Sequence, residues 1–131
     1  MKTYILIFLI SYSSYIYANE LPMEKFIHVI SNNYTKVHCS ESGYGGACFA
    51  IPTTECKVSI RSHIKQCFLT LRKEIPQSIA TKEEASLWSG KIMQCAGENF
   101  HHSHDNRFQF QWNCATLIGK TVKHNLFNKT P

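Results

Sequence analysis

After its first eighteen residues, the sequence lacks any apolar run of the roughly 20 residues that a membrane-spanning helix needs. It also lacks a Gly-x-Ser-x-Gly elbow, a His-Glu-x-x-His pair and a phosphate-binding glycine loop. These absences exclude the common serine hydrolases, zinc proteases and nucleotide-binding enzymes. Repeats and low-complexity tracts are missing too. The sequence therefore predicts one soluble domain without a cofactor.

The cysteines never occur at the Cys-x-x-Cys spacing that zinc sites and redox-active dithiols usually need. An even number of cysteines in a small exported domain instead predicts three structural disulfides, which leave no thiol nucleophile. The sequence alone does not determine how they pair. The six residues are Cys39, Cys48, Cys56, Cys67, Cys95 and Cys114.

The N-terminus has the three parts of a secretory signal peptide. Lys2 supplies the positive charge, Tyr4 to Ile10 form the apolar run, and a more polar segment ends at Ala18. The run is too short for a retained membrane anchor, so we expect cleavage after Ala18. Residues 1–18 are then the signal and residues 19–131 a single domain with a formal charge of +4, because Lys2 is removed. The destination is periplasmic or extracellular.

Apolar residues at helical spacing predict an all-α fold, an irregular bundle of about four helices stapled by the disulfides. The predicted helices span 22–37, the segment between Pro52 and Pro76, 81–100 and, with an extended entrance, 108–126. Cys56 and Cys67 share one face but lie eleven residues apart, about 16 Å along the axis. Each must therefore pair with a different segment.

Two surfaces are candidates for binding a partner. The first is the glycine-rich loop over 39–53, in which we expect Tyr44 and Phe49 to be exposed on a pinned backbone. The second is the row formed by Lys57, Arg61 and Lys65 at four-residue spacing. That row suits an acidic protein or an anionic surface, although a charged row is also typical of an ordinary solvated helix face. The charge is too modest to indicate nucleic-acid binding.

Histidines gather at His101, His102 and His104, followed by Asp105. Imidazole and carboxylate groups this close could bind a transition metal. The stretch 101–106 is, however, predicted to be a turn, and we expect its side chains to diverge into solvent without holding a metal.

Rigidity without a catalytic motif favours a non-catalytic protein that binds another protein, such as an inhibitor or a toxin-immunity protein. The alternative is a small secreted hydrolase that uses histidine acid–base chemistry. A third possibility is a carrier that holds an apolar ligand within the bundle. The sequence fits a bacterial or a eukaryotic host. Asn33 and Asn128 lie in N-glycosylation sequons, which are used only in a eukaryotic secretory pathway.

Overall fold

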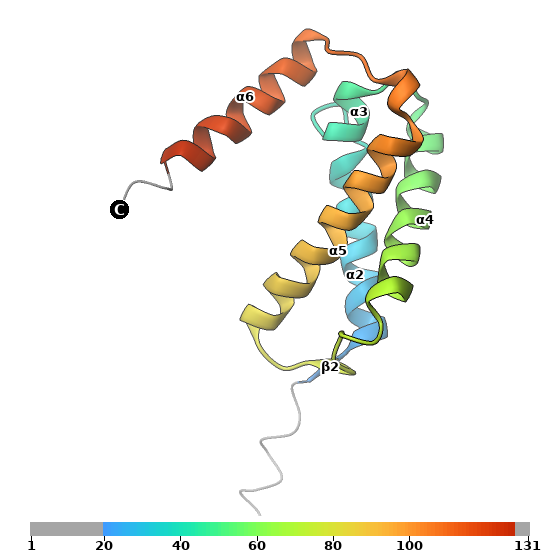
Figure 1. The fold of residues 1–131 in the computed structure, drawn as a ribbon, viewed down its shortest axis with the longest axis vertical. Coiled ribbons are helices and arrows are strands. Elements are labelled where there is room, and N and C mark those ends of the chain that lie inside the picture. Colours follow the sequence, from blue (N-terminus) through green and yellow to red (C-terminus); the bar gives the residue numbers. More distant parts are fainter. Residues whose placement is uncertain (1–19, 128–131) are drawn as a thin grey trace, which may run out of the picture.

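The computed structural model describes residues 20–127, with side chains through Lys120, as a helical bundle (Figure 1). This confirms the predicted all-α class with three disulfides. The signal peptide and its cleavage site lie outside the described residues. The elements are β1 (Leu21–Pro22), α2 (Met23–His38), α3 (Tyr44–Cys48), α4 (Thr53–Leu71), β2 (Ser78–Ile79), α5 (Lys82–Ser103), the 3-10 turn η2 (Asp105–Arg107) and α6 (Trp112–Phe127).

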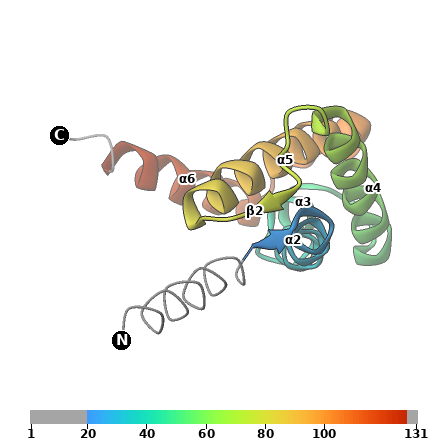
Figure 2. The same ribbon diagram turned by 90° about the horizontal axis from the view of Figure 1, so that it is seen from below.

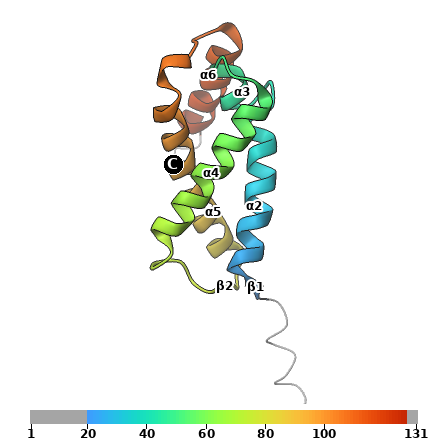
Figure 3. The same ribbon diagram turned by 90° about the vertical axis from the view of Figure 1, so that its right-hand side faces the viewer.

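Three long helices, α2, α4 and α5, lie along the longest axis and form the body of the bundle (Figure 3). The short strands β1 and β2 pair antiparallel at one end, with Leu21 opposite Ile79. Helix α6 starts at the other end and packs against α3, and its C-terminal end points away from the three-helix body (Figures 1 and 2). No helix among the described residues is long and apolar enough to cross a membrane.

The core lies between α4 and α5, and the predicted apolar rows of these helices line it. Ile60 and Ile64 of α4 meet Ile92, Ala96 and Phe100 of α5, and all five are buried. A smaller cluster near the strands contains Met23, Phe26, Ile79 and Trp88. At the start of α5, Thr81 and Glu84 have the three-residue spacing of a capping box, and the corresponding hydrogen bonds are present. Thr81 accepts a hydrogen bond from the Glu84 amide, and the Glu84 carboxylate accepts one from the Ala80 amide.

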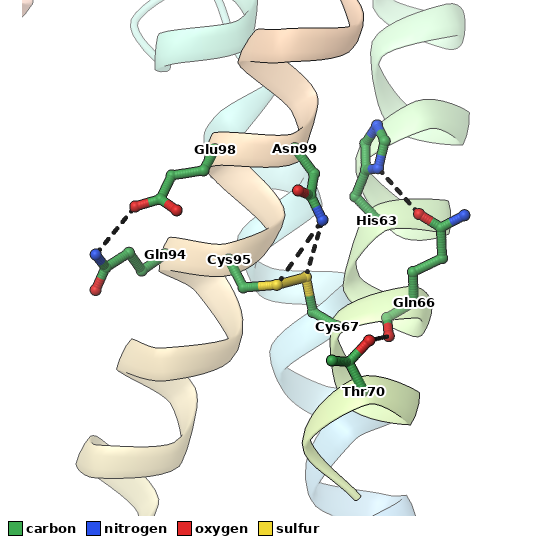
Figure 4. Close-up of a disulfide and its surroundings, with 8 residues drawn as sticks. All are labelled: His63, Gln66, Cys67, Thr70, Gln94, Cys95, Glu98 and Asn99. Carbon is green, nitrogen blue, oxygen red and sulfur yellow. Dashed lines mark hydrogen bonds between the residues drawn. A yellow bond between two sulfur atoms is a disulfide. The ribbon is translucent and has the colours of Figure 1, made fainter.

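Each of the three disulfides joins two different helical segments. Cys39–Cys56 ties the end of α2 to the start of α4, Cys67–Cys95 ties α4 to α5, and Cys48–Cys114 ties α3 to α6. The prediction that Cys56 and Cys67 have different partners is confirmed. Figure 4 shows Cys67–Cys95 with Asn99, whose side-chain amide donates to Cys67 Sγ at 3.4 Å.

The glycine-rich segment predicted to be a loop contains the short helix α3. Its glycines allow the chain to approach α2 closely. A Cβ on Gly45 would lie 2.7 Å from the His38 ring and 2.8 Å from Cys56 Sγ, and one on Gly43 would overlap the Val37 carbonyl oxygen. The backbone here turns back onto α2 because Cys48 must reach α6 while Cys39 reaches α4.

Two features of the long helices differ from the sequence prediction: the end of α5 and the inward face at the end of α2. Helix α5 does not end at Phe100 but continues to Ser103, because no glycine or proline follows Phe100 in this stretch and His101 packs against Phe49. At the end of α2, helical spacing from Met23 and Phe26 places Val37 in the inward apolar row, but Val37 is 65% exposed, whereas His38 is buried. The inward row of α2 shifts by one residue at its end, where His38 packs against Phe100.

Candidate functional site

A chain of polar contacts links α3 to the last turn of α5. The Tyr44 hydroxyl lies 2.8 Å from His101 Nδ1, and His101 Nε2 lies 3.5 Å from the Asp105 carboxylate. In the neutral imidazole tautomer that carries its proton on Nε2, Nδ1 accepts from the Tyr44 hydroxyl while the N–H lies toward Asp105. Burial raises the pKa of Tyr44 above its usual value. A surface hollow of about 290 Å³ lies beside Tyr44, His101 and His102.

The expectation that these histidine side chains diverge into solvent is wrong for His101 and His104, which are half-buried. His101 packs edge-on against Phe49, and His104 stacks on Phe100 with ring centroids 4.5 Å apart. Only His102 is exposed. Among the described residues, no group of three histidine, cysteine or acidic side chains is arranged to hold a metal ion.

Phe49 was expected to be an exposed contact residue, and this expectation is wrong. Its side chain is only 5% exposed and packs among Tyr44, Phe100 and Phe108. The cause is that Phe49 directly follows Cys48, whose disulfide draws this segment against α6, and pairs with Phe108 in a β-bridge. Tyr44 is half-buried, so only part of its ring remains available.

His38 is a functional candidate that the sequence did not single out. It is 3% exposed, and its Nε2 atom has no hydrogen-bond partner among the described residues. Burial lowers the pKa of His38 to about 4, so the ring is neutral at physiological pH. No local signal in the sequence marked it, because helical spacing placed Val37 in the inward row of α2. His63, beside the inward row of α4, is half-buried, and its Nε2 atom lies 3.1 Å from the Ser103 hydroxyl.

The basic row on α4 lies where the sequence predicted. Lys57, Arg61 and Lys65 are all exposed, and none forms an ion pair with a described residue. Arg72, which roughly continues the row, lies over the Phe68 ring at 5.9 Å. Val58 is also exposed on this helix, at 72% of its surface.

Exposed aromatic residues do occur, but on the segment entering α6 and not in the glycine-rich loop. Phe110 is 67% exposed and Trp112 is 83% exposed. Their alternation with glutamines indicated an extended entrance to the last helix, which is confirmed, since α6 begins at Trp112.

A largely apolar hollow of about 440 Å³ opens between α2 and α6, bordered by Tyr34, Val37 and Ile118. It bears on the carrier hypothesis, although it is a surface hollow and does not lie inside the bundle.

The fold defines a small all-α protein whose rigidity comes from three disulfides, a class suited to an oxidising compartment. The family described as "T2SS substrate NttA" matches residues 20–107. The chain belongs to this family, whose members are described as substrates of a type II secretion system. The protein is therefore exported, to a periplasmic or extracellular location, as the sequence predicted. No curated protein and no solved structure shows significant similarity to it.

Proposed function

We propose that this exported protein acts without catalysis, by binding the acidic surface of another protein through the outer face of α4. The supporting observation is a row of three cations, Lys57, Arg61 and Lys65, that lie on one face of α4 and form no ion pair within the described part of the chain. At four-residue spacing the row extends about 12 Å. A row of that length matches several carboxylates on a partner, as an inhibitor or toxin-immunity protein would need.

The composition of α4 strengthens this electrostatic argument. Glu55 is the only acidic residue of α4, and its carboxylate is already bound to Arg107 at 2.8 Å. Nothing on the helix therefore neutralises the row. Val58 and Leu69 are 72% and 55% exposed on the same helix. Aliphatic groups beside cations supply the apolar contact that charge alone does not give to an interface.

The disulfides prepare this surface for binding. Cys56 and Cys67, both buried on the inner face of α4, hold the helix to α2 and α5. A surface fixed in this way loses little conformational entropy when a partner docks.

The test uses the oxidised mature chain as bait in periplasmic extract and in culture medium, with chemical cross-linking to capture a partner. The captured protein is then purified and titrated with the wild type and with Lys57→Glu/Arg61→Glu. We expect at least about tenfold weaker binding by the variant, and weaker wild-type binding at high salt. The matched control Lys25→Glu/Lys36→Glu places the same charge change on α2 and should retain affinity. Equal losses in both variants would refute the α4 surface.

The half-buried Tyr44 remains the second contact candidate. Binding through Tyr44 would depend on its ring and would tolerate salt, whereas binding through the α4 row would not. Tyr44→Ala in the same titration separates the two.

A second function, the histidine-based hydrolase, is favoured by the Tyr44–His101–Asp105 contacts beside an open hollow. In this arrangement Asp105 orients the imidazole and the Tyr44 hydroxyl is the group that would act as acid or base. Turnover of ester or phosphodiester substrates that is lost in both Tyr44→Phe and His101→Gln would support it. Activity that persists in both variants would contradict it.

A further inference from the structure

Helix α6 is attached to the rest of the protein at its first turns. Cys114 is buried and bonded to Cys48, and Ala115 and Ile118 are half-buried. Beyond them the helix continues to Phe127 while its axis leaves the three-helix body (Figure 1). The matched family region ends at Arg107, so this helix lies outside it. The disulfide therefore links this helix covalently to α3.

The start of this helix exposes two aromatic side chains. Trp112 is 83% exposed and Phe110 is 67% exposed. Trp88, the other tryptophan, is buried beneath Lys91. Tryptophan is usually well buried in a globular protein, and its exposed occurrence is typical of surfaces that meet a protein partner or the lipid–water interface.

The charge of this segment decides between these two partners. Every one of the nine acidic residues precedes Phe108, whereas Lys120, Lys123 and Lys129 follow it. Apolar residues recur at helical spacing along α6, and Lys120 and Lys123 fall outside that row. The row consists of Ala115, Ile118, Val122 and Leu126. The apolar row meets the bundle at Ile118, so the lysines and the exposed aromatic pair remain for a partner, and a basic, aromatic segment without acidic residues suits the surface of an anionic bilayer.

We propose that α6, together with Phe110 and Trp112, docks onto the surface of bilayers that contain anionic lipids. The aromatic rings enter the headgroup region, and the lysines contact the lipid phosphates. This inference goes beyond the proposed protein binding, which uses a different helix. In Figure 1, α4 and α6 lie on opposite sides of the bundle, so the α4 row stays accessible while α6 is docked.

The exposed tryptophan provides its own probe. Unreduced mature protein is titrated with vesicles of phosphatidylcholine alone and with vesicles containing phosphatidylglycerol, and tryptophan emission is recorded. Trp112 emits from water, so docking shifts the emission to shorter wavelength with the anionic vesicles only. In Trp112→Phe the remaining Trp88 is buried before and after docking, and the shift should disappear. An unchanged wild-type spectrum with anionic vesicles overturns the proposal.

Co-sedimentation with the same vesicles separates α6 from the α4 row. We expect Lys120→Glu/Lys123→Glu to lower the partition coefficient at least about tenfold, since each lysine near an anionic surface contributes about 1 kcal/mol. Lys57→Glu/Arg61→Glu carries the same charge change on α4 and should sediment like the wild type. The reverse pattern, or equal loss in both variants, overturns docking through α6. Circular dichroism confirms that each variant is folded.

Discussion

The buried His38 should make the protein lose stability in mild acid. Its ring is enclosed by the Tyr34, Tyr44 and Phe100 rings, at centroid distances between 4.8 and 6.1 Å, and none of these carries a charge that would favour the imidazolium. Folding therefore favours the neutral form, and the pKa falls from 6.5 to about 4. The unfolded chain binds a proton more readily than the folded one between these values.

The sign and size of the effect follow from this difference. A depressed histidine pKa contributes its full stability above about pH 6.5, and the contribution falls as the pH drops toward the folded pKa. One proton gives about 1.4 kcal/mol per pH unit, so the loss is about 2 kcal/mol at pH 5 and about 3 kcal/mol at pH 4. Only well below the folded pKa of about 4 does His38 add no further change.

The assay is guanidinium unfolding of the disulfide-intact protein between pH 7.5 and pH 4, for the wild type and for His38→Gln. Other histidines and carboxylates titrate in both proteins, so the difference between the two pH profiles isolates His38. We expect the variant to be less stable at neutral pH but to have a shallower profile. An NMR titration of the imidazole protons gives the folded pKa directly. A value near 6.5, or parallel profiles, would refute the burial argument.

Three further changes test the packing. Gly90→Ala should stabilise the protein by about 0.5–1 kcal/mol, because nothing lies within 4 Å of the added Cβ; an unchanged or lower melting temperature would contradict this. Cys67→Ala/Cys95→Ala opens a link across 28 residues and should cost about 3–4 kcal/mol, measured by guanidinium unfolding; a loss below about 1 kcal/mol would show that the remaining contacts suffice. Phe49→Ala should cost about 3–5 kcal/mol, whereas the exposed Phe110→Ala should be close to neutral in the same assay, and similar losses would contradict the buried position of Phe49.

Local patterns in the sequence determined the class of fold and the best-defined helices. The apolar rows of α4 and α5 fixed which faces point inward, because residues three and four apart share a face in any α-helix. Thr81 and Glu84 marked the start of α5 because capping depends only on neighbouring amides. The separation of Cys56 and Cys67 excluded a bond between them for the same local reason. Exposure of the Lys57 row likewise followed from helix geometry.

The tertiary structure decided the pairing of the cysteines and everything that depends on it. Cys39 and Cys48 anchor α2 and α3 to different helices, and His38 and Phe49 beside them are buried. Helical spacing had instead placed Val37 in the core, and the glycine-rich segment was predicted to expose Phe49. The contact between Tyr44 and His101 joins residues 57 positions apart, and no local spacing encodes it. The disulfides impose constraints between residues far apart in the sequence, and local patterns do not encode them. A shift of one residue along a helix is enough to exchange a core position for a surface position, as at Val37 and His38.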